Sequence, residues 1–248
     1  MAKPEMDFHD TELIPWEELT KEPEQYVKIL AKCPKTGAFT RLIRSQPDLY
    51  ETITRYDNPP GKLLVHEDYW EEVYSFSGTL IDTTLNRTFK EGYFACRPPG
   101  MKHGPFFHPT SAVSYEVRTP DKLMDKPEIE FFDTNLLPWK SVEGVEGQYE
   151  KILDRDKKNK GFTRLVLNEP DMECCVRDIR FPREKAYIYD EHLWTEIMVL
   201  DGTILDVEEN ATYIKGYYAN FAPGKKHGPY FFPLGAMWIE TRYPELVL

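Results

Sequence analysis

The chain has 248 residues, of which 41% are hydrophobic and 29% charged, and its formal net charge is -11 at neutral pH. This length allows one large or two small domains with a buried core, and the composition argues against disorder. Because the acidic excess is spread along the chain without a dense Lys/Arg tract, we exclude nucleic acid as a partner and expect no attraction to anionic membranes.

The sequence carries no membrane or export signal. No run approaches the roughly 20 apolar residues of a membrane-spanning helix, and residues 1–12 lack the apolar stretch of a signal peptide. The cysteines contain no C-x-x-C pair, which argues against a disulfide framework or a thiolate zinc site. We therefore expect a cytoplasmic protein.

An internal repeat organises the chain. The spacing between the copies is 123 residues near the start and 124 residues after a single insertion. A repeat this long is not that of a solenoid and predicts two duplicated domains, which we place at residues 1–125 and 126–248. The matching segments are 11–16 with 134–139, 39–42 with 162–165, and 103–105 with 227–229.

Within each repeat, short β-rich segments alternate with turns. Only residues 16–30 suggest a short helix, and Pro23 limits its length. Loops at residues 57–61 and 98–100 are marked by Pro and Gly. Many short, closely spaced strands predict an all-β sandwich or closed barrel in each domain. In the first repeat the predicted strands, rich in Val, Tyr, Phe and Thr, are 71–77, 79–83, 93–97 and 111–118.

Histidines and carboxylates gather at the same places in both repeats. If residues 66–72 form a strand, its alternate side chains share one face, and antiparallel pairing can bring His103 beside them. A lone His is most often an ordinary core or surface residue, so the recurrence carries the prediction. Two His and two carboxylates suit iron, manganese, zinc or nickel. The sets are His66, Asp68, Glu72 and His103, and then Asp190, His192, Glu196 and His227.

An ion pair and several aromatic residues accompany these clusters. Glu116 and Arg118 recur as Glu240 and Arg242. Residues two apart on a strand face the same way, so each pair could hold a substrate carboxylate and move a proton, although a structural ion pair is the commoner interpretation. Aromatic residues around the clusters could line a substrate pocket, or pack as barrel core instead. They are Trp70, Tyr74, Phe94, Phe106, Phe107, Trp194, Tyr218, Tyr230 and Phe231.

Residues 92–103 (GYFACRPPGMKH) resemble the second motif of the cupin superfamily, G-x5-P-x-G-x2-H, and residues 216–227 resemble it with Ala222 in place of the first proline. The first cupin motif has H-x-H, then Glu after three or four residues, then Gly, and each repeat has Asp in place of one His. The resemblance extends to cupins of the acetylacetone-dioxygenase type and covers both halves. It implies two tandem jelly-roll barrels, also called double-stranded β-helices.

The resemblance also implies a ligand set in each barrel. The first would comprise His66, Glu72 and His103, with Asp68 as a possible fourth, and the second would comprise His192, Glu196 and His227, with Asp190 as a possible fourth. Asp68 and Asp190 would act either as ligands or as general bases. The cofactor expected is a divalent transition metal, Fe(II) first, with Mn(II), Zn(II) or Ni(II) as alternatives. A homodimer is expected as well.

Three functions remain open at this point. The first is an Fe(II) dioxygenase acting on a small oxygenated molecule such as a diketone, hydroxyketone or phenol. The second is a redox-silent decarboxylase, lyase or isomerase that uses Mn(II), Zn(II) or Ni(II) as a Lewis acid. The third is a sensor or ligand-binding module without catalysis. Fold alone does not decide among them.

Overall fold

The computed structural model describes residues 3–19, 24–50, 63–120, 122, 124–174, 188 and 190–245. Within these ranges the regular structure is β-strand apart from short 3-10 turns, which confirms the all-β prediction. None of the described segments is a helix long and apolar enough to cross a membrane. The loop expected at residues 57–61 lies outside the described residues.

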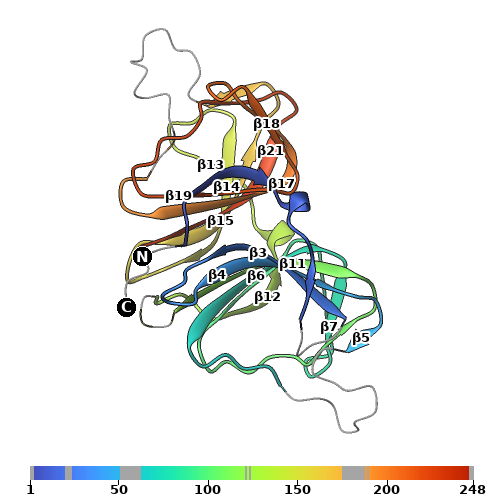
Figure 1. Cartoon of the computed structure of the whole chain (residues 1–248). Helices are drawn as coiled ribbons and strands as arrows, with labels where there is room; N and C mark the ends of the chain where they lie inside the picture. Colours follow the sequence, from blue (N-terminus) through green and yellow to red (C-terminus); the bar gives the residue numbers. More distant parts are fainter. Residues whose placement is uncertain are drawn as a thin grey trace. The chain divides into compact units, whose positions relative to one another are not determined.

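The chain divides into two compact units, and Figure 1 shows each as a twisted β-barrel. Most of the first unit is Ile14–Leu136. Its seven-stranded sheet has the order β12-β9-β6-β11-β4-β3-β2, and a four-stranded sheet has the order β5-β10-β7-β8. The strands are β2 (Glu17–Glu18), β3 (Gln25–Lys32), β4 (Phe39–Ser45), β5 (Leu49–Tyr50), β6 (Tyr69–Ser77), β7 (Thr79–Asp82), β8 (Arg87–Lys90), β9 (Tyr93–Arg97), β10 (Phe106–His108), β11 (Ala112–Pro120) and β12 (Ile129–Asp133).

The second unit comprises Pro4–Leu13 and Leu137–Glu245. Its main path has the order β1-β19-β17-β21-β15-β14-β13, and β16, β18 and β20 complete the barrel. The strands are β1 (Met6–Asp10), β13 (Lys140–Ser141), β14 (Gln148–Arg155), β15 (Phe162–Asn168), β16 (Met172–Cys174), β17 (Trp194–Asp206), β18 (Ala211–Ile214), β19 (Tyr217–Phe221), β20 (Tyr230–Phe232) and β21 (Ala236–Tyr243).

The first strand of each repeat belongs to the barrel of the other repeat. β1 pairs with β19, and the equivalent strand β12 pairs with β9. The 3-10 turns that follow, η1 (Thr11–Leu13) and η3 (Thr134–Leu136), anchor these strands, since the hydroxyl groups of Thr11 and Thr134 donate to the carbonyl groups of Gly216 and Gly92. The compact units therefore differ from the division expected at residue 126.

The short helix expected within residues 16–30 is wrong for the described part of that segment. β2 and β3 form an antiparallel pair there, with Glu17 opposite Val27. β3 also pairs along its length with β4. Its residues Val27, Leu30 and Ala31 are buried. Tertiary pairing thus decides the structure of a short apolar run that periodicity leaves ambiguous.

A glycine occupies the same position in the long inner strand region of each barrel. Gly78 separates β6 from β7, and Gly202 lies within the single strand β17. Both have φ of +81°, and a Cβ on either would collide with backbone across the barrel, at Ser111 and Gly235 respectively. Glycine is therefore required at both positions.

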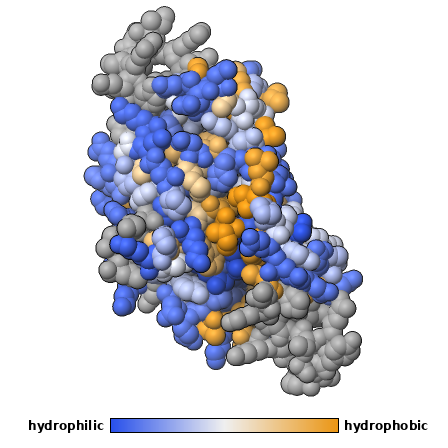
Figure 2. Space-filling model, in the orientation of Figure 1, coloured by the Kyte–Doolittle hydropathy of each residue, from blue (hydrophilic) through white to orange (hydrophobic). Residues whose placement is uncertain are grey.

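The two barrels are filled to different extents. A cluster of twelve buried residues occupies the interior of the second barrel, including Phe221, Phe232 and Trp238. The corresponding cluster of the first barrel has six buried residues, among them Val73, Leu80 and Phe106. Figure 2 shows that the visible surface is mainly hydrophilic, with separate hydrophobic patches. The buried apolar cluster of the described residues is therefore smaller in the first barrel than in the second.

Candidate metal centre

Two backbone contacts bring His66 and His103 together in the first barrel. An isolated bridge joins Leu64 to His103, in which the N–H group of each donates to the carbonyl of the other at 3.0 and 3.1 Å. The Gly100 N–H group donates to the His66 carbonyl at 2.8 Å. The centroids of the two imidazole rings consequently lie 5.5 Å apart.

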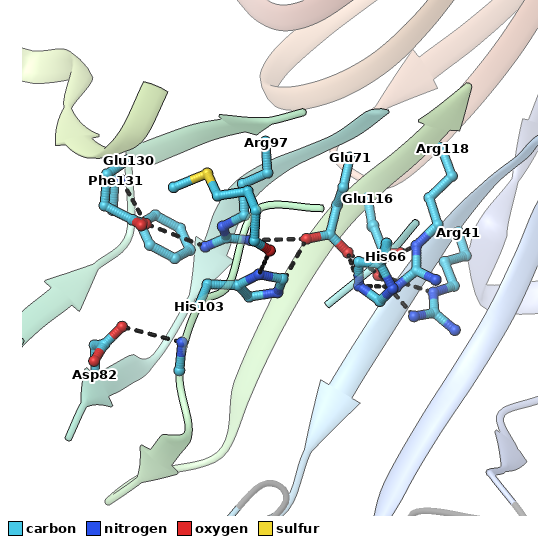
Figure 3. A network of polar contacts seen from close by, with 12 residues as sticks. Arg41, His66, Glu71, Asp82, Arg97, His103, Glu116, Arg118, Glu130 and Phe131 are labelled. Carbon is cyan, nitrogen blue, oxygen red and sulfur yellow. Dashed lines mark hydrogen bonds and ion pairs between the residues drawn. The ribbon is translucent and has the colours of Figure 1, made fainter. Parts of the chain in front are cut away.

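Glu71 of β6 completes the cluster. Its carboxylate Oε1 lies 3.1 Å from His66 Nε2, and its Oε2 lies 3.5 Å from His103 Nε2 (Figure 3). In the part of the chain that the structure describes, this is the only group of three His, Cys, Asp or Glu residues whose ligand atoms all lie within 4.8 Å of one another. His66, Glu71 and His103 are called the metal cluster below.

The geometry of the metal cluster fits a divalent ion. Such ions bind imidazole nitrogen and carboxylate oxygen at about 2.0–2.2 Å, so adjacent ligand atoms lie about 3.0–3.5 Å apart. The two separations given above fall in this range. His103 Nδ1 is 3.2 Å from the Met101 carbonyl. A carbonyl only accepts, so Nδ1 donates and the Nε2 lone pair faces Glu71, the orientation usual for metal-binding histidines.

The charge states also suit a cation. Burial raises the pKa of the Glu71 carboxyl, but the hydrogen bond with His66 and the charges of Arg97 and Arg118 outweigh it and hold this pKa well below its usual range. Burial lowers the pKa of His103 to about 4, and the charge of Arg97 acts in the same direction. At neutral pH a carboxylate therefore faces a neutral imidazole lone pair. A cation between the Glu71 carboxylate and the His103 Nε2 lone pair would be bound by both acceptors.

Arg97 holds Glu71 from the side of β9. Its Nη1 lies 2.8 Å from Glu71 Oε2, and its Nη2 lies 3.4 Å from Glu130 Oε1. The guanidinium carbon also lies 4.7 Å from the centroid of the Phe131 ring. Both Glu130 and Phe131 belong to β12, so the strand that the second repeat contributes helps to position Glu71.

Glu116 and Arg118, expected to act on the substrate, form a clamp with Arg41. Glu116 Oε2 accepts from Arg41 Nη2 at 2.8 Å, and Glu116 Oε1 contacts Arg118 Nε. Arg41, Glu116 and Arg118 all line the cavity, and Glu116 is only 3% exposed. The second barrel repeats the arrangement with Glu240, which contacts Arg164 and Arg242. A clamp present in both barrels is part of the barrel architecture.

A cavity of about 320 Å³ opens beside the metal cluster and is lined by all three of its residues. Apolar side chains form much of its wall, including Leu64, Val73, Leu80, Phe106 and Phe131. This volume is at the low end of the range for small-molecule sites, which runs from about 300 to 1,000 Å³. The site therefore suits a small organic molecule.

Glu72 and Asp68, expected as ligands, lie elsewhere. Glu72 points to the other face of β6, where Oε2 is 2.7 Å from Lys126 Nζ. Asp68 is exposed in a bend before β6. The expectation that residues 66–72 form one continuous strand is the source of this difference, because β6 begins at Tyr69 and the alternation does not extend back to His66.

Among the aromatic residues expected at a substrate pocket in the first barrel, Phe106 lines the cavity, whereas Trp70, Tyr74 and Phe107 do not. Trp70 and Tyr74 alternate with the cavity-lining Glu71 and Val73 on β6, and Phe107 alternates with Phe106 on β10. Burial, together with the charge of Glu91, raises the pKa of Tyr74 to about 12. Because successive residues of a strand point to opposite faces, the side chains that line the cavity are sequence neighbours of Trp70, Tyr74 and Phe107.

The second barrel does not bring its expected ligands together. Asp190 Oδ2 pairs with Arg242 at 2.8 Å, and Tyr218 donates to Glu196 at 2.7 Å. His192 is exposed. His227 stacks on Phe221 with ring centroids 4.0 Å apart and contacts Tyr230, its Nδ1 lying 2.9 Å from the hydroxyl oxygen. Trp194 and Phe231, expected at a substrate pocket here, are half-buried.

Sequence reasoning missed Glu71 because it favoured residues present in both repeats. The equivalent of Glu71 is Thr195, whereas Glu72 recurs as Glu196. The spacing of the first cupin motif could have identified Glu71, because in the motif three or four residues separate the second histidine of H-x-H from a Glu. With His66 in that place, four residues separate it from Glu71, and Gly78 follows at the end of β6.

Comparisons with solved structures identify the fold. A candidate dioxygenase from Nostoc punctiforme matches with a TM-score of 0.71 and 13% identity, covering 97% of this chain and 83% of that chain. A candidate glyoxylate-induced protein from Pseudomonas aeruginosa matches with a TM-score of 0.67 and 10% identity over 99% and 90% of the two chains. The chain has the cupin fold in two copies.

A further cupin structure in the comparison has a defined metal. Oxalate decarboxylase from Bacillus subtilis, which has Mn(II) centres, matches with a TM-score of 0.56 and 12% identity, covering 100% of this chain and 79% of that chain. No family model and no curated protein sequence matches the chain. At these identities the likeness establishes the fold, and the site itself must carry any statement about function.

Proposed function

We propose that the first barrel is a metal-dependent active site and that the chain is an Fe(II) dioxygenase acting on a small oxygenated molecule, such as a diketone, hydroxyketone or phenol. The metal cluster on the cavity wall carries the proposal. Two imidazoles and one carboxylate leave open positions on an octahedral ion, as in non-haem iron oxygenases. Ferrous iron held there would supply Lewis acidity and redox chemistry with dioxygen. Similarity to the candidate dioxygenase supports this reaction class.

The chain's own residues would bind and orient the substrate. The charged side chains of the described cavity lining, apart from the histidines, are Arg41, Arg97, Arg118, Glu71 and Glu116. Three positive and two negative groups leave a net positive charge before any metal is counted. This charge favours a substrate with an anionic oxygen, such as an enolate or phenolate, which the guanidinium groups can orient. The apolar walls would exclude water from the reacting atoms.

The second candidate function is a redox-silent reaction on a carboxylate substrate with Mn(II), Zn(II) or Ni(II). Two observations favour it: the similarity to oxalate decarboxylase with its Mn(II) centres, and the arginines in the cavity, which suit a carboxylate. The two candidates differ in their need for oxygen, because only the dioxygenase consumes it. The expected homodimer and cytoplasmic location stay predictions.

Metal analysis tests the site. Elemental analysis of the purified full-length protein should find about one transition metal ion per chain, and Glu71→Gln or His103→Gln should remove most of it. His227→Gln is the matched control, since His227 occupies the position of His103 in the second barrel. It should leave the metal content unchanged. Wild-type protein that retains no metal after growth and purification with added Fe(II), Mn(II) or Zn(II) would contradict the proposal.

Oxygen uptake tests the reaction class. After reconstitution with Fe(II), oxygen consumption is followed with acetylacetone, hydroxyketones and phenols, with Glu71→Gln as the negative control. Uptake that depends on both substrate and Glu71 supports the dioxygenase. Product formation under anaerobic conditions from oxalate or another small carboxylic acid would support the redox-silent enzyme instead.

A further inference from the structure

Polar side chains also occupy the part of the first barrel that lies away from the metal cluster. On β6, Ser75 follows Glu71 and Val73 on the same face, because alternate residues of a strand point the same way. Ser114 of β11 stands directly opposite Ser75 and lines the cavity. His108 of β10 lines the cavity too. All three are buried, at 3% exposed for Ser75, 9% for Ser114 and 5% for His108.

The strand register separates this polar group from the charged end of the cavity. Ser75 lies four residues beyond Glu71, or about 13 Å along the strand. On β11, Arg118 stands opposite Glu71 and Glu116 opposite Val73. The charged residues of the described lining therefore occupy the level of the metal cluster and the next level, whereas the serines lie beyond them. A ligand group at the serine level would meet neutral hydrogen-bonding partners.

The second barrel shows that the fold does not need polar residues at these positions. The equivalents of Ser75, Ser114 and His108 are Val199, Trp238 and Phe232, and all three belong to its apolar core cluster. Buried polar groups are unfavourable unless they form hydrogen bonds. The Ser75 hydroxyl has no hydrogen-bond partner within the described residues. Packing alone thus favours apolar residues here, whereas Ser114 and His108 present polar groups to the cavity, where a ligand can meet them.

We propose that Ser114 and His108 form a polar subsite, with Ser75 behind Ser114, that binds a neutral hydroxyl or carbonyl group of the substrate at the end of the cavity remote from the metal cluster. The inference rests on the proposed function for the other end of the substrate, whose anionic oxygen lies at Arg118. The substrate is then bifunctional, and the apolar section between its two polar ends lies against Val73 and its neighbours on the wall.

A series of matched probes of increasing chain length tests the subsite through binding affinity, without measuring turnover. Straight-chain ω-hydroxycarboxylates of four to ten carbons are compared with the corresponding unsubstituted carboxylates, by calorimetry on Zn(II)-loaded full-length protein. The hydroxyl group should tighten binding by about three- to tenfold, the value of one hydrogen bond, at one or two chain lengths only. A hydroxyl that brings no gain at any length, or the absence of binding by every probe, overturns the proposal.

Variants of the two residues that line the cavity locate the gain. Ser114→Ala and His108→Phe should each reduce the preference for the hydroxylated probe, and Val199→Thr in the second barrel is the control that should preserve it. Zinc content is measured in the same samples, so loss of metal would indicate failure of the metal proposal instead. If both Ser114→Ala and His108→Phe retain full metal content and full hydroxyl preference, the subsite lies elsewhere and the assignment is overturned.

Discussion

Arg118 and Glu71 form an ion pair that a bound metal ion would have to rearrange. Arg118 Nη2 lies 2.9 Å from Glu71 Oε1 and 3.1 Å from His66 Nε2. A guanidinium only donates, so it is directed at Glu71 Oε1, and it also lies beside His66 Nε2, a second atom that would bind a metal. Figure 3 shows Arg118 beside Glu71 and His66, so Arg118 would compete with a divalent ion for these side chains.

The first prediction follows from this competition. Arg118→Leu should tighten Zn(II) binding by about tenfold or more, because it removes both a competing donor and a positive charge a few ångströms away. Affinity is measured by competition with a chromophoric chelator. Arg242→Leu, the equivalent change in the second barrel, should have no effect. Unchanged or weaker Zn(II) binding by Arg118→Leu would show that the guanidinium supports the site.

The second prediction concerns Asp82, which anchors the loop that carries His103. Its Oδ2 accepts from the Gly104 N–H group at 3.3 Å, and its Oδ1 accepts from Thr84 and Leu85 at 2.9 and 2.8 Å. Asp82→Ala should lower the free energy of unfolding by about 1–3 kcal/mol, the usual effect of losing charged hydrogen bonds. It should also weaken metal binding, because His103 loses its support.

Asp206→Ala provides the control for Asp82. Asp206 Oδ1 caps the equivalent turn in the second barrel through the N–H groups of Glu208 and Glu209. The two variants should lose similar stability in urea denaturation, but only Asp82→Ala should lose metal affinity. If the two variants had equal metal affinity, the Asp82 turn would not support the metal cluster.

Much of the fold could be predicted from the sequence. The strands expected at residues 71–77, 79–83, 93–97 and 111–118 correspond to β6, β7, β9 and β11. The exchange of β1 and β12 could not be predicted, because equivalent strands of two similar repeats fit either barrel by sequence. Only the tertiary pairing of β1 with β19 and of β12 with β9 distinguishes the alternatives.

The site was predicted less completely than the fold. The sequence indicated the imidazoles of His66 and His103, because each belongs to a cupin-like motif. Glu71 was hidden because it differs from Thr195, and a search based on recurrence discards such positions. In a duplicated protein, residues that differ between the copies can mark function. In the first barrel Glu71 stands opposite Arg97. The equivalent pair in the second barrel is Thr195 opposite Phe221, which has no charged group.

The third prediction uses the buried clamp of the second barrel. Burial raises the pKa of Glu240, but the charges of Arg164 and Arg242 outweigh it and lower the pKa to about 2. Glu240 therefore contributes stability above its ordinary pKa of 4.5, which is lost as the pH falls from about 4.5 through 2. This contribution is on the order of 3 kcal/mol.

Glu240→Gln should remove that dependence. At pH 7 the variant should be less stable by roughly 3–5 kcal/mol, because Arg164 and Arg242 lose a buried partner. Between pH 4.5 and 2 its free energy of unfolding should fall less steeply than that of the wild type. Urea denaturation at several pH values measures both effects. Parallel curves for the two proteins would show that Glu240 does not titrate in this window.

The fourth prediction concerns His227, a histidine of the second barrel's core. Burial lowers its pKa to about 4 from an ordinary value of 6.5. The unfolded chain therefore binds this proton at higher pH than the folded chain does. Stability from the neutral imidazole is complete above about pH 6.5 and is lost as the pH falls toward 4, by roughly 3 kcal/mol in total.

His227→Phe should keep the stacking on Phe221 and abolish this acid dependence, so that its unfolding free energy changes less than that of the wild type between pH 6.5 and 4. Tyr230→Phe is the matched control, because it removes the 2.9 Å contact to His227 Nδ1 but leaves the imidazole in place. It should lose about 1 kcal/mol at pH 7 and retain the steep dependence. If Tyr230→Phe flattened the curve as much as His227→Phe, the contact between the two side chains, and not burial alone, would set the titration of His227.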